Sequence, residues 1–302
     1  MAKKNSLFNT LCTLCVTFLI LLASAPLITL AIPTTQLIPI SSITSTSDAT
    51  EKEISPAIFT ETHVDLPANT NNQPEYDIFT YSERQERSLP TVLPIIEPYY
   101  STKVIYLTFD DGPSPENTLI VLDILKENNI KATFFVLGTE IEKYPTILKR
   151  IYDEGHAIGN HSYNHIYRQL YQSVNTYIEQ LHHTDELMRG ILNVRSHISR
   201  APGGSAGSFT KAYWDILQKQ GYIEVGWNIS SGDASNANAD QILNNIIDQT
   251  EKNKFLWSHA ILLMHDGRGH AETVKALPHI IKFYKEHGFD FRIINSKTPS
   301  AW

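Results

Sequence analysis

The sequence predicts an α/β fold in which parallel strands alternate with helices and form a closed or nearly closed barrel. Seven short apolar stretches between Val104 and Ile294 have the length of strands, and stretches with helical periodicity separate them. Such alternation is typical of parallel βα units. Seven units in about 200 residues suit a barrel, while a doubly wound open sheet is the alternative.

Capping and breaking residues set the boundaries of these elements. Ser114 precedes Pro115, a pair that suits the first turn of a helix. Gly155, Gly221 and Gly288 each follow a helical stretch, where glycine often ends a helix. The expected strands are 104–109, 132–136, 157–159, a short strand before Arg200, 222–227, 260–264 and 289–294, and the expected helices are 114–129, 145–154, 174–191, 210–220, 240–251 and 272–287.

The first 32 residues predict export. Lys3 and Lys4 precede an apolar run over 7–32 that exceeds the roughly 20 residues needed to cross a bilayer. The small residues at 23–25 offer a cleavage site, but Pro26 follows it and is unfavourable for a signal peptidase. We therefore expect residues 1–32 to be a signal peptide or membrane anchor, with retention favoured. The positive end should stay in the cytoplasm and the rest of the chain outside.

Residues 33–100 are expected to form a mostly extended linker before a catalytic domain over 101–302. The stretch is rich in Ser, Thr and Pro, and all fourteen glycines of the chain lie at or beyond Gly112. The competing interpretation is a small folded domain, which the apolar cluster over 92–96 favours. A compact domain without glycine would be unusual.

Composition excludes several classes of protein. The net charge is −7 and no basic block is present, so nucleic-acid binding has no electrostatic support. The only cysteines, Cys12 and Cys15, lie in the N-terminal apolar run, and the thioredoxin-like context of a redox pair is missing. The catalytic domain should thus have no disulfide and no thiol nucleophile. We expect a monomer.

Five of the expected strands are followed directly by polar residues of the kind found in active sites. In a βα barrel, functional residues gather where the strands end, so these side chains should meet on one rim. They are Asp110 and Asp111 after the first strand, His161 and His165 after the third, Arg200 after the fourth, Asp233 after the fifth and His265 in the sixth.

The two histidines have the spacing of metal ligands. His161 and His165 are four residues apart, so on a helical turn both rings would face the same way. A carboxylate from Asp110 or Asp111 would complete three ligands, and an open fourth position is typical of a catalytic metal site. A solvated helix can carry such a pair without any metal, but the aspartates at the same rim favour a metal. An iron oxygenase uses a similar set, usually on an antiparallel β scaffold.

The two adjacent aspartates can have different roles in the reaction. If one binds the metal, the other can act as a base beside it, kept ionised by Arg200. The reaction also needs a proton donor, for which His265 with Asp233 as its partner is suitable. The alternatives are an ordinary salt bridge for Arg200 and a strand-end histidine for His265.

These motifs resemble those of the polysaccharide deacetylases, the NodB-homology group or carbohydrate esterase family 4. The resemblance rests on Thr108-Phe-Asp-Asp-Gly-Pro113, His161-Ser-Tyr-Asn-His165, Arg200-Ala-Pro202, Asp233 and Leu263-Met-His265, and covers residues 103–294. It implies a deformed (β/α)7 barrel that removes N-acetyl groups from a glycan. It further implies Asp110 as general base, Asp111, His161 and His165 as metal ligands, His265 as general acid, Arg200 orienting the base and Asp233 tuning the acid.

The sequence departs from the family at the expected substrate groove. Gly203 and Gly204 follow Pro202 where many members have an aromatic residue, and Ala234 follows Asp233 where an aromatic is frequent. We expect a thinner groove lined by Pro202, Gly203, Trp227 and Leu263. Trp227 can refill part of the gap or belong to the core.

The function expected from these observations is hydrolysis by a metal-bound water of N-acetyl groups on N-acetylglucosamine in cell-wall peptidoglycan. The cofactor is one divalent metal, with zinc favoured and cobalt, nickel or manganese also compatible with the ligand set. The substrate partner is an N-acetylated glycan, and the N-terminal segment contacts the membrane, which places the enzyme outside the cell. Alternatives are chitooligosaccharide, acetylated xylan, or a non-catalytic barrel that binds the wall.

Overall fold

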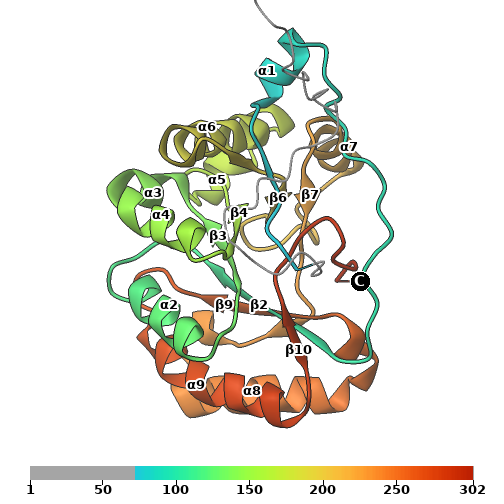
Figure 1. Cartoon of the computed structure of the whole chain (residues 1–302). Helices are drawn as coiled ribbons and strands as arrows, with labels where there is room; N and C mark the ends of the chain where they lie inside the picture. The colour runs from blue at the N-terminus through green and yellow to red at the C-terminus, as the bar shows by residue number, and fades with distance from the viewer. Residues whose placement is uncertain (1–71, 302) are drawn as a thin grey trace, which may run out of the picture. The chain divides into compact units, whose positions relative to one another are not determined.

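A curled parallel sheet forms the centre of the protein, and its strands run in the order β7-β6-β4-β3-β2-β9-β8 (Figure 1). The computed structural model describes residues 72–301. A further strand, β10, pairs with the first half of β2. The strands of this sheet are β2 (Val104–Asp110), β3 (Thr133–Val136), β4 (Ala157–Asn160), β6 (Ile198–Ser199), β7 (Ile223–Glu224), β8 (Ile229–Ser230), β9 (Ala260–His265) and β10 (Asp290–Arg292).

The sheet curls into a half-barrel and does not close within the described residues. Its order ends at β7 on one side and at β8 on the other, although the two strands are only four residues apart in the chain. The residues between them make other bonds: the carbonyl oxygens of Val225 and Gly226 accept hydrogen bonds from Arg200. The prediction of parallel βα units is confirmed, and the expected barrel is an open one.

Most helices have the predicted boundaries within one residue. Those helices are α4 (Pro145–Asp153), α6 (Val174–Leu192), α7 (Lys211–Lys219), α8 (Ala239–Lys252) and α9 (Ala271–Glu286). The sequence interpretation missed α3 (Gly138–Lys143), α5 (Tyr167–Leu170) and strand β8, all of which are short.

Helix α2 (Thr118–Glu127) begins later than predicted, because the residues before it bond to the loop after β9. Ser114 Oγ donates to the carbonyl oxygen of Asp266, and Asn117 Nδ2 donates to that of Gly267. The backbone N–H of Ser114 donates to Thr118 Oγ1. Residues 114–117 therefore join two loops at the carboxyl edge of the sheet instead of forming a first helical turn.

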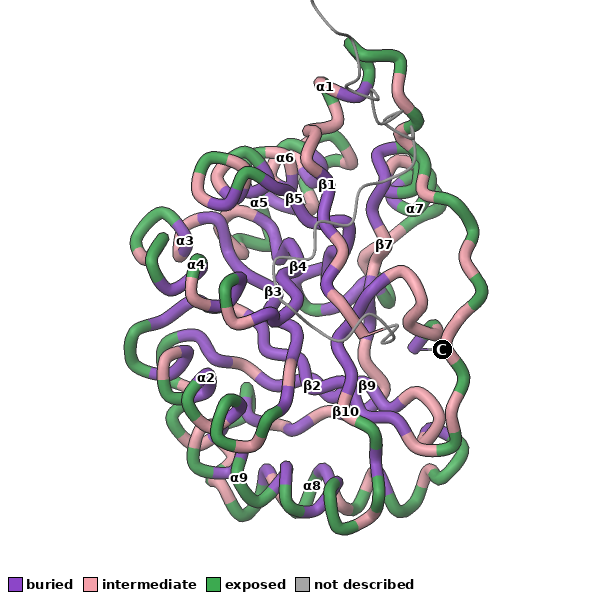
Figure 2. Tube along the Cα trace, in the orientation of Figure 1, coloured by how far each residue is buried: buried purple, intermediate pink, exposed green. Residues whose placement is uncertain are grey.

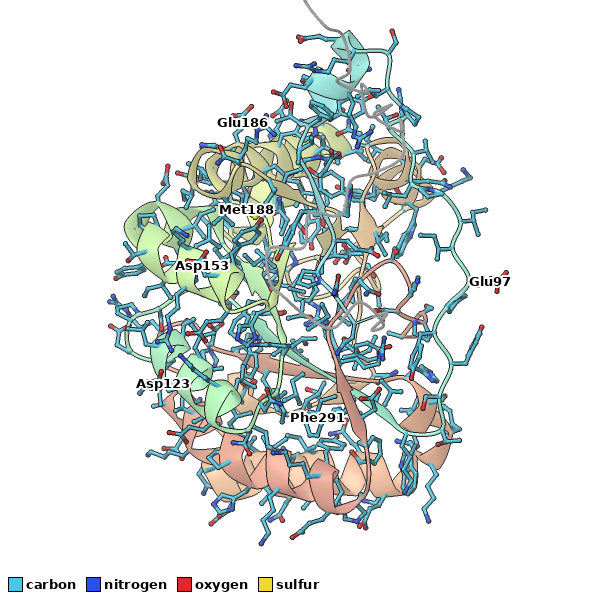
Figure 3. All side chains as sticks on the ribbon, in the orientation of Figure 1. Glu97, Asp123, Asp153, Glu186, Met188 and Phe291 are labelled. Atoms are coloured by element: carbon cyan, nitrogen blue, oxygen red, sulfur yellow. The ribbon has the colours of Figure 1, made fainter. Side chains whose placement is uncertain are left out.

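Buried residues lie along the strands and on the inner sides of the helices, as Figure 2 shows by colour, and they form clusters on both faces of the sheet. Successive residues of a strand point to opposite faces. Leu107 and Phe109 accordingly belong to the large cluster that includes α2, α8 and α9, whereas Tyr106 belongs to a smaller cluster with Phe135. Carboxylates on the outer helices, such as Asp123, Asp153 and Glu186, are exposed (Figure 3).

Residues 76–86 of the expected linker are folded onto the domain, whereas residues 89–100 contain no helix or strand. Strand β1 (Tyr76–Asp77) pairs antiparallel with β5 (Arg195–Ser196), and α1 (Tyr81–Glu86) follows it. Asp77 is buried and accepts hydrogen bonds from the buried side chains of Arg84 and Arg195. The mostly extended linker expected over 33–100 thus contains one ordered stretch among its described residues, which the buried ion pairs of Asp77 hold in place.

The expected signal or anchor segment over 1–32, and the linker up to residue 71, lie outside the described residues. Within 72–301, none of the helices has the length and apolar character that crossing a membrane requires.

Candidate active site

The strand ends bring the predicted site residues together on one edge of the sheet. Asp110 at the end of β2 is paired in register with His265 at the end of β9. On the other side, Asn160 at the end of β4 pairs with Ser199, and the N–H of Arg200 donates to the carbonyl oxygen of Asn160. Parallel pairing therefore places the residues that follow β2, β4, β6 and β9 next to one another.

Asp110 is almost completely buried, and Arg200 fixes one of its oxygens. Arg200 Nη1 donates to Asp110 Oδ1 at 2.9 Å and to Thr108 Oγ1 at 2.7 Å. The other oxygen of Asp110, Oδ2, lies 3.7 Å from His161 Nε2. A hydrogen bond from a buried guanidinium fixes the orientation of a carboxylate. One oxygen of Asp110 is thus held in place, and the other faces His161.

Arg200 is itself fully buried and held at every nitrogen. Its Nε and Nη2 donate to the carbonyl oxygens of Val225 and Gly226, both at 3.0 Å. Its guanidinium carbon lies 4.1 Å from the ring centroid of Phe135. A guanidinium with this many partners can be buried without loss of its charge. The orientation of Asp110 therefore depends on a rigid neighbour.

Asp111, His161 and His165 form a group that fits a divalent metal ion. Asp111 Oδ1 lies 3.5 Å from His161 Nε2 and 3.6 Å from His165 Nε2. Ligands of a tetrahedral zinc ion at the usual bond lengths are about 3.4 Å apart. Asp111 Oδ1 is also buried with no hydrogen-bond partner among the described residues, which is costly unless a cation or a donor satisfies it. The donor set and its spacing would suit a divalent ion, and the assignment of these three residues as ligands stays a prediction.

The two histidines lie on a loop, which corrects the expectation of a helical turn. Residues 161–166 contain no helix, and Ser162 and His165 adopt positive φ angles of 74° and 57°. His161 Nδ1 donates to the carbonyl oxygen of Arg200 at 2.7 Å, which leaves Nε2 free to face Asp111. The left-handed backbone turns the His165 ring toward Asp111 as well. The two histidine rings are therefore brought together by the loop conformation and not by the helical turn that the four-residue spacing suggested.

Asp233 holds His265 in a charged form. His265 Nδ1 donates to Asp233 Oδ1 at 2.8 Å, and the backbone N–H of His265 donates to Oδ2 at 2.7 Å. Burial alone would lower the pKa of His265, but the hydrogen bond and the charge of Asp233 outweigh it and raise this pKa to about 9. Thr273 Oγ1 also donates to Asp233 Oδ2. His265 can therefore carry a proton on Nε2 at neutral pH.

Asp233, His265 and His270 form a second group with the composition of a metal site. The rings of His265 and His270 are stacked with centroids 4.8 Å apart, and His270 Nδ1 lies 3.9 Å from Asp233 Oδ2. Both oxygens of Asp233 already accept hydrogen bonds from His265 and Thr273. We interpret this group as support for the charged His265, and His270 as a member that the sequence interpretation missed.

Other polar residues around the site also escaped the sequence interpretation. Glu224 accepts hydrogen bonds from the backbone N–H of Ala201 and from Ser199 Oγ, which fixes the loop that carries Arg200. Asp266 is buried beneath the turn after Asp111, and burial raises its pKa to about 7. Asp266 directly follows His265 in the sequence, a signal that was available, whereas nothing in the sequence around Glu224 indicated its partners.

The four residues predicted to line the groove differ in their access to solvent. Gly203 is exposed, Trp227 is half-buried, and Pro202 and Leu263 are buried. A Cβ at Gly204 would lie 2.9 Å from Trp227 Cη2, so this ring occupies the space beside the glycine. Trp227 also packs against the smaller core cluster, and its ring centroid lies 5.8 Å from the guanidinium carbon of Arg200, so it has core contacts, while its role in the groove stays a prediction.

Comparisons with known proteins agree with these motifs. The family model of the polysaccharide deacetylases matches residues 98–225. A peptidoglycan-N-acetylglucosamine deacetylase of Bacillus cereus is 36% identical over 211 residues, which cover 67% of this chain and 70% of the relative.

Two solved structures are similar over most of the domain. A CE4 esterase of Streptococcus mutans has a TM-score of 0.60 and 31% identity, covering 65% of this chain and 87% of the other. The catalytic domain of a peptidoglycan N-acetylglucosamine deacetylase of Eubacterium rectale has a TM-score of 0.60 and 29% identity, covering 68% and 94%.

Proposed function

The chain belongs to the polysaccharide deacetylase family, and we propose from this premise that it removes N-acetyl groups from N-acetylglucosamine in cell-wall peptidoglycan. The proposal rests on three groups of residues that lie together at one edge of the sheet. The first is the candidate metal-binding group of Asp111, His161 and His165. The other two are the buried carboxylate of Asp110, held by Arg200, and the charged His265, held by Asp233.

We propose that Asp111, His161 and His165 hold one divalent metal ion, with zinc favoured and cobalt, nickel or manganese compatible. The ion supplies Lewis-acid chemistry, which polarises a carbonyl group and makes water more acidic. This chain's part is to fix the ligands: the bond from His161 Nδ1 to the carbonyl oxygen of Arg200 orients one ring, and the backbone of His165 orients the other.

Asp110 and His265 then move the protons. Asp110 accepts a proton from the attacking water through Oδ2, the oxygen that Arg200 does not hold. The water oxygen forms a bond to the acetyl carbon, and the carbon–nitrogen bond of the amide breaks. His265 gives its Nε2 proton to the leaving amine, while Asp233 stabilises the ring through Nδ1. The products are acetate and a free amino sugar.

We propose further that the protein acts outside the cell, with residues 1–32 kept as a membrane anchor and the linker giving reach into the wall. Determining the N-terminal sequence of protein recovered from membranes tests this anchor. A mature protein that starts between residues 24 and 40 would contradict retention and leave a secreted enzyme.

Acetate release from defined substrates tests the activity. The full chain, supplied with zinc, should release acetate from purified peptidoglycan, with chitooligosaccharide and acetylated xylan as parallel substrates. Release from xylan alone would replace the proposal with an O-acetyl esterase. A folded, metal-loaded protein that releases no acetate but binds peptidoglycan would be a wall-binding barrel.

A further inference from the structure

Gly203 lies in direct contact with Tyr167, the first residue of helix α5. A Cβ on Gly203 would lie 2.9 Å from Tyr167 Oη and 3.0 Å from its Cε1, closer than real side chains come. The φ angle of Gly203 is +73°, a conformation that also disfavours a side chain. Tyr167 therefore fills the space beside Pro202 that the two glycines leave open in the sequence.

The ring of Tyr167 is fixed by its neighbours. It meets the ring of His165 edge-on with centroids 5.2 Å apart, and it stacks on Tyr171 at 6.1 Å with an interplanar angle of 16°. Tyr171 in turn donates its hydroxyl hydrogen to the carbonyl oxygen of Pro202 at 2.7 Å. The loop that carries His165 is thus joined to the loop after Arg200 at two points, and both points involve these tyrosines.

Tyr167 is nevertheless 51% exposed, which is unusual for a large aromatic ring that contacts this many neighbouring residues. Tyr163, on the same loop, provides a contrast. Its ring stacks on His183 at 4.2 Å, and its hydroxyl donates to Glu142, so protein groups take up both its face and its polar end. Tyr167 instead leaves much of its surface in solvent beside a candidate metal ligand.

We propose that Tyr167 is a substrate-positioning residue whose exposed ring packs against the sugar that carries the acetyl group. A pyranose ring presents C–H groups on its faces, and the negative face of an aromatic ring suits them. This inference rests on the proposed function, because it supposes an acetylated sugar at the edge where Asp111 and His165 lie. It changes the expectation of a thinned groove: one wall is supplied by Tyr167 instead of a side chain at position 203.

Substitution of Tyr167 separates positioning from chemistry. Tyr167→Leu keeps apolar bulk but loses the flat face, so KM for N-acetylchitotetraose should rise about tenfold, the change that 1.4 kcal/mol produces. The value of kcat should stay within about threefold, and zinc content should not change. Tyr167→Phe keeps the ring and should retain both constants. Tyr100→Ala, at a tyrosine that is 75% exposed outside the site, is the matched control.

A double-mutant cycle tests the contact with Gly203. Gly203→Ala should raise KM and lower the thermal midpoint in the wild-type background, and both effects should shrink in Tyr167→Ala. The cost of the positive φ angle is the same in both backgrounds, so the difference reports the contact alone. Equal effects in the two backgrounds, or a Tyr167→Leu variant with lowered kcat and unchanged KM, would overturn the proposal.

Binding distinguishes this inference from the proposed function. If wild-type protein releases no acetate from any glycan, the proposed function fails. Calorimetric titration with N-acetylchitotetraose then decides the role of Tyr167. Weaker binding to Tyr167→Leu than to wild type supports the positioning role, and equal binding or none to either protein contradicts it.

Discussion

Replacement of Asp233 by asparagine should move the alkaline limit of activity to lower pH. His265 must be protonated to protonate the leaving amine, so activity is lost as the pH rises through its pKa. That pKa is about 9 because Asp233 outweighs the effect of burial. Asparagine keeps the size of the side chain but removes the charge, so the pKa should fall toward the ordinary histidine value of about 6.5, with burial lowering it and the charges of Asp110 and Asp111 still raising it.

The loss can be calculated near pH 7.5. A group with a pKa of about 9 is about 97% protonated there, and one with a pKa of about 6.5 is about 9% protonated. The value of kcat/KM near pH 7.5 should therefore fall by up to about tenfold from protonation alone. A bound cation would lower the pKa of His265 in both proteins, so the difference between their alkaline limits is the quantity to compare.

The assay is the pH dependence of kcat/KM for acetate release, with NMR titration of His265 as a direct reading. Thr273→Val is the matched control, since it removes a neutral hydrogen bond from Asp233 and leaves its charge. The control should shift the alkaline limit much less than Asp233→Asn does. An alkaline limit that is the same in wild type and Asp233→Asn would refute the role given to Asp233.

Two predictions concern stability. Asp77→Ala leaves Arg84 and Arg195 buried without this carboxylate, so the unfolding free energy measured by urea titration should fall by about 3–5 kcal/mol. Asp123→Ala removes an exposed ion pair and should lower the unfolding free energy by less than about 1 kcal/mol. A similar loss of unfolding free energy in both variants would show that the buried ion pairs of Asp77 stabilise the fold no more than an exposed ion pair does. Burial and Arg195 lower the pKa of His197 to about 4, so the unfolded state binds a proton between about pH 4 and pH 6.5 that the folded state does not. Stability should fall as the pH is lowered through this range, and His197→Asn should reduce that slope, which an unchanged slope would contradict.

The periodicity of the sequence predicted the large elements because their apolar faces are buried against a single sheet. The helices from α4 onward that exceed eight residues have boundaries within one residue of expectation. Short elements such as β8 were missed, since two paired residues carry no pattern of their own. The start of α2 was wrong because Ser114 and Asn117 bond to residues about 150 positions away, which no local signal reveals.

The candidate site was predictable where chemistry requires particular residue types at strand ends. Asp110, Asp111, His161, His165, Arg200, Asp233 and His265 all lie at one edge of the sheet, as expected. The supporting residues were not predictable. Glu224 bonds to a backbone N–H and to a serine hydroxyl, and Tyr167 occupies space left by the missing side chain of Gly203, so neither leaves a motif in the sequence.

The adjacent aspartates allow the most direct test of the account, because one is proposed to bind the metal and the other to accept a proton. The measurement is the zinc content of dialysed Asp110→Asn and Asp111→Asn proteins, taken together with acetate release with and without added zinc. Asp110→Asn should keep its zinc and lose about 10²–10⁴ in rate, which added zinc does not restore. Asp111→Asn should lose its zinc first and regain part of its activity at high zinc concentration. Equal zinc loss in the two variants would contradict the division of roles, and full activity in either variant would contradict the site itself.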